Sequence, residues 1–372
     1  MAPRFVISAN VPSALLRFSR APSRNLGRPI AASIPIPILC IQHRARFSTE
    51  SPAPSPSPKT SGPLVRVTNL PAPGSGHIRI LELNRPEARN AISRALLSAL
   101  RDEIDAVHAQ YDAATGDEIP VPSWNKKFGG TVGDDKMGPT RALIIASTAD
   151  TSFCAGADLK ERRGFSQEET DAFLLKLRST LTSISTIPVP TISAISSLAL
   201  GGGLELALAT HFRVLTSNAT VGLPETRLGI IPGAGGTFRL PALIGVGRAR
   251  DLIVTGRRVT AAEAYFLGIA DRLVEVLAGS EEEAKAWEAA EQTERNRQEL
   301  ARARRLALSE AVRLAGEICE GGPIAVRAAI KAVEQPREDV EISMYERVVT
   351  SQDRNEALKA FGERRKPVFT GR

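Results

Sequence analysis

The chain has 372 residues, of which 42% are hydrophobic and 24% charged, a composition typical of a globular protein with one large domain or two smaller ones. It has no run of about 18 uncharged apolar residues, so we predict no transmembrane helix. Its three cysteines (Cys40, Cys154, Cys319) and four histidines lack the spacing of a disulfide framework or a metal site, so we predict no bound metal.

The formal net charge of +7 originates at the N-terminus. Residues 1–48 contain seven arginines and no lysine or acidic residue. Without these seven, the 48 basic residues of the chain fall to 41, which equals the 41 acidic residues. The remainder is therefore neutral, and its charge does not indicate a nucleic-acid-binding protein.

The N-terminal region, residues 1–47, has the composition of a mitochondrial transit peptide, because it is rich in arginine and serine and has no acid. We predict cleavage near Phe47 and a location in the mitochondrial matrix. The alternative is an N-terminal tail without a targeting role. Residues 48–63 follow as a proline- and serine-rich linker that cannot form a core.

From Leu64 onward, patterns typical of strands and helices alternate. Short apolar runs predict buried strands, and apolar residues at helical spacing predict amphipathic helices. The predicted strands are 77–84, 142–147 and 189–196, and the predicted helices are 92–111, 170–186 and, in the tail, 324–361. This order favours an α/β or α+β fold in which helices cover sheets.

Two segments fall outside this alternation. Residues 112–140 are rich in glycine and acid and predict a surface loop, which is either functional or an ornament. Residues 278–307 carry many charges of both signs, which is typical of a helix with a solvated face.

The most informative stretch is residues 197–209, SLALGGGLELALA. Three glycines open an apolar helix, whose first N–H groups have no partner within the helix. Such groups can face a developing negative charge. Gly202 and Glu205 are three positions apart and so share a helix face. The alternative is a glycine turn that only packs this helix against a sheet.

Two other motifs also contain glycine turns. SFCAGADLKER (152–162) predicts a turn into a helix that starts around Asp158, with free N–H groups near Ala157. VGLPETRLGIIPGAGGTFRL (221–240) contains Glu225 and a tight turn at Gly233. This turn is not followed by the lysine of a phosphate-binding P-loop, and it lacks the glycine spacing of a dinucleotide-binding motif.

Together these motifs resemble the crotonase, or enoyl-CoA hydratase/isomerase, family. The resemblance extends from about Leu64 to Phe369 and includes LNRPEARNAIS (83–93) and AFGERRKPVF (360–369). It implies a crotonase-like spiral of ββα turns in a catalytic core at residues 64–275. A helical trimerisation region is expected at 276–372, in a homotrimer or homohexamer that does not attach to membranes.

The resemblance also implies a binding site for an acyl-CoA thioester. The backbone N–H groups of Ala157 and Gly202 match the oxyanion hole of the family, and Glu205 and Glu225 match its two carboxylates. Contacts with the substrate or its coenzyme A part are expected from Arg89, Ala155, Ala157, Asp158, Leu159, Lys160, Gly201 and Gly233. A solvated arginine is the alternative for Arg89, and a plain turn is the alternative for Gly233. Coenzyme A is part of the substrate, so no separate cofactor is expected.

Two glutamates favour a hydratase over an isomerase, because adding water to a 2-enoyl thioester requires both a base and a proton donor. We expect syn addition of water across the C2=C3 bond. Glu205 would activate the water and Glu225 would protonate C2, with coupled protonation of the two carboxylates.

Within the family, the motifs are most similar to hydratases that act on 3-methylglutaconyl-CoA in mitochondrial leucine degradation. Lys160, Arg162 and Arg163 are candidates for binding the distal carboxylate of that substrate. A short-chain enoyl-CoA hydratase of fatty-acid β-oxidation is one alternative, and an RNA-binding or noncatalytic protein with the same fold is another. Acidic residues within the helix 92–111 oppose RNA binding, which depends on clustered positive charge. Cys154 is interpreted as a packed residue and His211 as structural.

Overall fold

The computed structural model describes residues 62–120 and 137–372 of the chain. The predicted transit peptide (1–47), nearly all of the linker (48–63) and the middle of the predicted loop (112–140) lie outside the described residues. All described residues belong to one compact unit, Pro56–Arg372.

A six-stranded sheet forms the larger of two sheets. Its strand order is β1-β2-β3-β5-β7-β10. Only β1 and β2 are antiparallel, and each later neighbour is parallel. The strands are β1 (Val65–Pro71), β2 (His77–Leu83), β3 (Thr140–Ser147), β5 (Thr191–Ile195), β7 (Phe212–Thr216) and β10 (Arg272–Val274). Strands β3 and β5 are buried along their whole length, as continuous apolar runs in parallel sheets predict.

The smaller sheet has four strands in the order β4-β6-β8-β9. Strands β4, β6 and β8 are mutually parallel, and β9 is antiparallel to β8. The strands are β4 (Ser152–Cys154), β6 (Leu198–Leu200), β8 (Thr220–Gly222) and β9 (Arg258–Thr260). The chain visits the large sheet, the small sheet and then a helix in three successive turns, so the predicted spiral of ββα turns is present.

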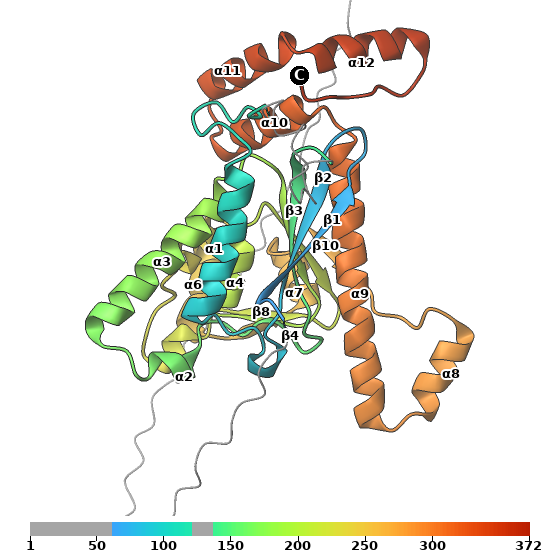
Figure 1. The fold of residues 1–372 in the computed structure, drawn as a ribbon. Helices are drawn as coiled ribbons and strands as arrows, with labels where there is room; N and C mark the ends of the chain where they lie inside the picture. Colours follow the sequence, from blue (N-terminus) through green and yellow to red (C-terminus); the bar gives the residue numbers. More distant parts are fainter. Residues whose placement is uncertain (1–61, 121–136) are drawn as a thin grey trace, which may run out of the picture. The chain divides into compact units, whose positions relative to one another are not determined.

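The helices cover both faces of the large sheet (Figure 1). Helices α1 and α3 pack side by side on one face, while the long α9 crosses strands of the other. The helices are α1 (Arg94–His108), α2 (Leu159–Arg162), α3 (Gln167–Ser185), α4 (Gly202–Leu208), α5 (Gly236–Ile244), α6 (Val246–Thr255), α7 (Ala261–Leu267), α8 (Glu281–Ala289), α9 (Gln292–Cys319), α10 (Pro323–Glu334), α11 (Glu338–Val349) and α12 (Gln352–Glu363). None of the helices within the two described ranges is long and apolar enough to cross a membrane.

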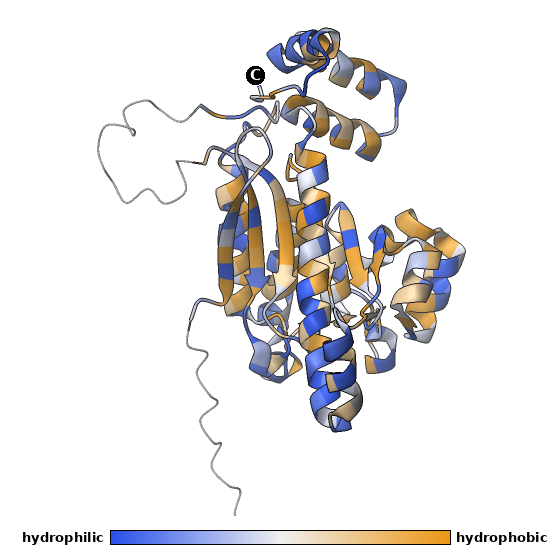
Figure 2. Cartoon of the chain, turned by 90° about the vertical axis from the view of Figure 1, so that its right-hand side faces the viewer, coloured by the Kyte–Doolittle hydropathy of each residue, from blue (hydrophilic) through white to orange (hydrophobic). Residues whose placement is uncertain are grey.

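Alternating strand residues supply two hydrophobic cores. Leu81 and Leu83 of β2 face the core that contains α1, α3 and the small sheet. Ile78 and Ile80 face α9, whose buried alanines allow the helix to approach the sheet closely. The exposed side of α9 is hydrophilic (Figure 2).

The segment 278–307, which was predicted to be helical with a solvated face, forms two helices. It forms α8 and the first half of α9, with a break at Ala290 and Glu291. Ala303 and Ala307 of α9 are buried against other parts of the protein, and Trp287 of α8 is buried as well, so each of the two helices has a buried side in addition to its solvated one. Small alanines between charged residues give a weak hydrophobic signal, which explains the difference.

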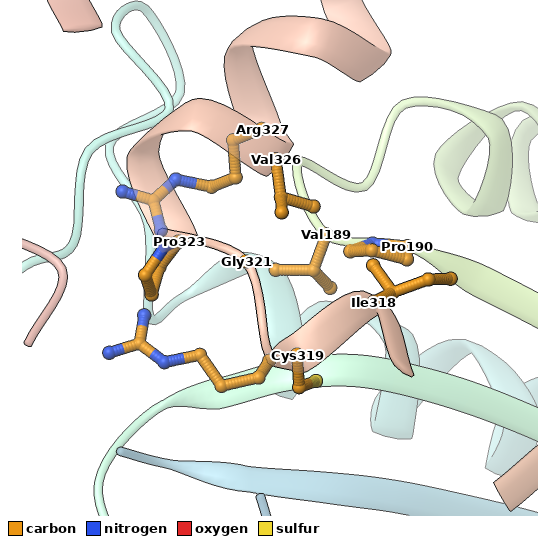
Figure 3. A pocket seen from close by; sticks show the side chains of 9 residues that line it. Val189, Pro190, Ile318, Cys319, Gly321, Pro323, Val326 and Arg327 are labelled. Atoms are coloured by element: carbon orange, nitrogen blue, oxygen red, sulfur yellow. The ribbon is translucent and has the colours of Figure 1, made fainter. Parts of the chain in front are cut away.

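Part of the predicted loop 112–140 is anchored to the rest of the protein. Glu118 accepts hydrogen bonds from Arg141 of β3 and from Arg327 of α10 (2.9 Å for the latter), and both arginine side chains are buried. Both arginines also line a small pocket at the start of α10. Figure 3 labels Arg327 there, together with Pro323 and Val326 of the same helix. Glu118 therefore links β3 of the large sheet to α10.

Candidate active site

One cavity collects most of the residues that the sequence predicts to act on substrate. It has a volume of about 510 Å³ and is walled by α3, the start of α4, the 3-10 helix η3 (Glu225–Leu228) and the turns before α2 and α5. Its carboxylates are Glu205 and Glu225. Parallel strands β4, β6 and β8 lie side by side, and the three predicted catalytic segments follow their carboxyl ends.

Two backbone N–H groups are available at the cavity wall. Ala157 follows β4, and Gly202 is the first residue of α4. The two positions are close, because a Cβ built on Gly202 would stand 3.6 Å from the Ala157 nitrogen. Neither N–H group donates a hydrogen bond to any residue in 62–120 or 137–372. Two adjacent free donors can therefore bind one oxygen that carries partial negative charge.

Close backbone approaches explain the glycines beside these donors. Gly156 has φ +95°, and a Cβ there would lie 2.7 Å from the carbonyl oxygen of Leu200. Gly201 has φ +55°, and its Cβ would lie 2.9 Å from Oε1 of Glu225. Both positions have a positive φ that favours glycine. At Gly156 a side chain would also collide with backbone, whereas at Gly201 it would displace the Glu225 carboxyl. The glycines thus bring the end of β4, the start of α4 and Glu225 together.

Glu205 lies in the first turn of α4 and is almost fully buried. Its Oε1 accepts hydrogen bonds from the N–H groups of Ala234 (2.7 Å) and Gly236 (2.8 Å), in the turn before α5. Burial raises the pKa of Glu205 above its usual range, while these hydrogen bonds and the charges of Arg239 and Arg178 oppose the rise. Backbone donors therefore hold one oxygen of this carboxylate in a fixed orientation.

Glu225 begins η3 directly after Pro224 and is also buried. Its Oε2 has no hydrogen-bond partner among the described residues. Burial raises the pKa of Glu225 to about 7, and the negative charge of Glu205 contributes to the rise. The two carboxyls thus differ in environment: Glu205 has two backbone donors, whereas Oε2 of Glu225 has none among the described residues and the pKa of Glu225 is raised to about 7.

This arrangement suits proton transfer beside a carbonyl-type oxygen. A carboxylate fixed by hydrogen bonds can act as a base, and a carboxyl with a raised pKa can act as an acid. The paired N–H groups can stabilise the negative charge that forms on the oxygen meanwhile.

The other predicted contacts divide into two groups. Ala155, Leu159, Gly201 and Gly233 line the cavity together with Ala157. Arg89, Asp158 and Lys160 are absent from its lining.

Each residue of the second group has a different position. Arg89 and Lys160 are exposed. Asp158 caps α2 and forms an ion pair with Arg85 (2.6 Å). Burial alone would raise the pKa of Asp158, but the hydrogen bond from Arg85 and the capping bonds lower it. The Asp158 side chain therefore supports the loop, and a role in substrate contact stays a prediction.

Two arginines near the site were not predicted from the sequence. Nε of Arg178, on α3, donates to the carbonyl oxygen of Gly233 (2.6 Å), and Arg239 donates to that of Ala234 (2.9 Å). Both therefore anchor the turn that holds Glu205. Helical spacing is one signal that could place Arg178 near the site, because Arg178 is four residues after Leu174, which lines the cavity, and so lies on the same face of α3.

The residues interpreted as structural lie away from the cavity lining. Cys154 is fully buried, and burial raises the pKa of its thiol to about 12. His211 accepts a hydrogen bond from the N–H of Thr191 (3.0 Å) and contacts Glu334 (3.0 Å) through its other nitrogen. Within 62–120 and 137–372, no group of three or more His, Cys, Asp or Glu residues could hold a metal ion.

Comparison with known proteins adds independent findings. A family model described as Enoyl-CoA hydratase/isomerase matches residues 133–372. The chain is 63% identical over 356 residues to a protein of Pyricularia oryzae named Methylglutaconyl-CoA hydratase 1, mitochondrial, and this match covers 96% of the chain and 97% of the relative. It is 52% identical over 310 residues to an Enoyl-CoA isomerase/hydratase of Zymoseptoria tritici, covering 83% of the chain and 88% of the relative.

The fold is also similar to solved structures. The crystal structure of an enoyl-CoA hydratase from Bacillus anthracis matches with a TM-score of 0.65 and 34% sequence identity. The match covers 83% of this chain and 100% of that chain. The sequence and structure comparisons therefore both match proteins described as enoyl-CoA hydratases or isomerases.

Proposed function

Because the chain belongs to the enoyl-CoA hydratase/isomerase family, we propose that it adds water to the C2=C3 bond of a 2-enoyl-CoA thioester. The observation that carries the proposal is the meeting of two free N–H groups and two dissimilar buried carboxyls in one cavity. An isomerase needs only to move a proton, whereas hydration needs a base for water and a donor for C2.

The thioester oxygen binds between the N–H groups of Ala157 and Gly202. As water attacks C3, electrons move from the C2=C3 bond towards this oxygen, which gains enolate character. Loss of one such donor typically costs about 2.7–4 kcal/mol of transition-state stabilisation. Since both donors are backbone groups, their geometry depends on the glycines rather than on side chains.

The two glutamates complete the addition. Glu205 takes a proton from water as the water oxygen bonds to C3, and Glu225 transfers its own proton to C2. The product carries hydroxyl on C3 and hydrogen on C2. The pair then holds its proton on Glu205 instead of Glu225, and a proton shift restores the starting state. The pair therefore acts with one proton in total.

We propose 3-methylglutaconyl-CoA as the substrate, because the relative named for its hydration is 63% identical over nearly the whole chain. The reaction would then be a step in mitochondrial leucine degradation. Coenzyme A is part of this substrate, so we propose that no separate cofactor takes part.

A mitochondrial location is proposed from the arginine-rich, acid-free residues 1–47 and from relatives named as mitochondrial. A homotrimer or homohexamer is proposed from the large apolar side chains that the single chain exposes on its later helices, such as Phe266, Tyr345 and Phe361. Binding to RNA has little support, because Arg94 and Arg101 of α1 are paired with acidic residues.

A side-by-side hydration assay tests the substrate. The purified full chain should hydrate 3-methylglutaconyl-CoA with a higher kcat/KM than crotonyl-CoA. Comparable turnover of crotonyl-CoA would favour a general short-chain hydratase and would contradict the substrate assignment. Glu205→Gln and Glu225→Gln should each lower kcat by about 10²–10⁴-fold while circular dichroism stays unchanged. A near-normal kcat in either variant would contradict the role of that glutamate.

A further inference from the structure

The cavity that contains Glu205 and Glu225 also has two positively charged side chains on its wall. They are Arg162, from α2, and Arg178, from α3. Of the three basic residues predicted to meet a distal carboxylate, only Arg162 lines this cavity, whereas Lys160 and Arg163 are exposed outside it. The remainder of the lining is apolar or backbone apart from Thr170 and the two glutamates.

Helix α3 directs one face towards this cavity. Thr170, Leu174, Leu177 and Arg178 all line it, at the spacing of one helix face. Leu174 approaches the turn before α5, because a Cβ on Gly233 would be 3.4 Å from its Cδ2. The Nε of Arg178 is 2.6 Å from the carbonyl oxygen of the same Gly233. Arg178 is therefore fixed beside the turn that holds Glu205.

Neither guanidinium forms an ion pair with an acidic side chain of the described residues, although the charge of Arg178 acts on Glu205 from a longer distance. The bond from Arg178 to Gly233 uses only Nε, which leaves the two terminal amino groups of this side chain for another acceptor. Arg162 lies 5.9 Å from the ring centre of Phe173, an interaction that orients the side chain without neutralising it. Arginine is suited to bind a carboxylate through two parallel hydrogen bonds.

We propose that Arg162 and Arg178 form a receptor for a second carboxylate on the acyl group of the substrate. This inference rests on the proposed hydratase function and specifies the substrate class as enoyl thioesters whose acyl group carries a second carboxylate. In 3-methylglutaconyl-CoA, the second carboxylate is two bonds from C3, where water adds. It must therefore lie near Glu205 and Glu225, and an uncompensated negative charge there would be repelled.

The two arginines would determine which acyl group binds, whereas the N–H groups and the glutamates would carry out the reaction. An acyl group without the second carboxylate would leave the guanidiniums without an anion, so it would bind more weakly. The catalytic groups would meet the same thioester in both cases.

Binding of two unreactive saturated analogues tests the proposal independently of turnover. 3-Methylglutaryl-CoA and isovaleryl-CoA differ only in the second carboxylate, and isothermal titration calorimetry gives both Kd values for one protein sample. The wild-type chain should prefer 3-methylglutaryl-CoA by about tenfold or more, as expected for charged hydrogen bonds. Arg162→Met and Arg178→Met should each reduce this preference towards equality.

Arg163→Met is the matched control, because Arg163 directly follows Arg162 in the sequence but does not line the cavity. It should keep the wild-type preference. Equal weakening of both ligands in the Arg162 and Arg178 variants would assign these arginines to the coenzyme A part or to the turn, and would overturn the proposal. A wild-type chain without any preference would overturn it as well. Failure of the hydratase function would instead appear as absent turnover of every enoyl-CoA, with the binding preference intact.

Discussion

The proton held by the two glutamates should determine how the reaction depends on pH. Hydration needs Glu205 ionised and Glu225 protonated, and the reverse dehydration needs the opposite arrangement. Both states contain one proton, so the same form of the free enzyme serves both directions. Burial and the charge of Glu205 raise the pKa of Glu225 to about 7, and above that pH the pair loses its last proton.

The expected size of the effect follows from this pKa. At one pH unit above a pKa of about 7, roughly one tenth of the enzyme retains the proton. The kcat/KM for hydration should therefore fall about tenfold for each further unit. At low pH it should fall again when the pair gains a second proton, because the pKa of Glu205 is also raised.

This profile is measured from initial rates at low substrate concentration. The loss of ultraviolet absorbance of the conjugated thioester gives the rate at each pH. Dehydration of the matching 3-hydroxyacyl-CoA should show the same basic limb. Glu225→Gln serves as the control, because its residual activity should lack the limb centred near pH 7. A wild-type rate that stays constant or rises between pH 6.5 and 9 would refute the assignment of Glu225 as proton donor.

Three other substitutions test the supporting structure. Gly201→Ala should lower kcat by about tenfold or more in the hydration assay, because the new Cβ would meet Glu225; unchanged kcat would contradict the close approach. Glu118→Ala should lower the free energy of unfolding by about 3 kcal/mol in urea titrations at fixed protein concentration, because two buried arginines lose their acidic partner. A loss below about 1 kcal/mol would show that water or the remaining bonds of Arg141 to Ser75 stabilise the two charges instead. Arg239→Gln should move the acidic limb of kcat/KM to higher pH, since its positive charge opposes the raised pKa of Glu205; an unmoved limb would exclude that influence.

Much of the fold and the core of the candidate site could be predicted because their signals are local. Continuous apolar runs predicted β3 and β5, and the helix predicted at 92–111 is α1, which begins at Arg94 after its cap Ser93. The glycine motifs predicted where backbone N–H groups would be free. Family resemblance then joined segments about 45 and 20 residues apart into one site, a step that local patterns do not permit.

The remainder depends on contacts between distant segments. Strands of only three residues, such as β4 and β9, are too short to show a pattern of alternation. Arg178 sits on an ordinary charged helix position, and its role emerges only when the turn at Gly233 is placed against α3. Glu118 likewise lies in a polar loop, and its partners are 23 and 209 residues away.

The alignment of β4, β6 and β8 has a consequence for how this site can change. Each strand ends in a separate loop that supplies one component: an N–H group at Ala157, an N–H group with a carboxylate at the start of α4, and the second carboxylate at Glu225. Neighbouring strands are about 4.8 Å apart, so hydrogen bonds of the sheet fix the spacing of the three loops. A single loop can therefore lose or exchange its group while the other two stay in place. Substitution of one loop would alter the reaction, whereas a register slip in any one strand would disable the whole site.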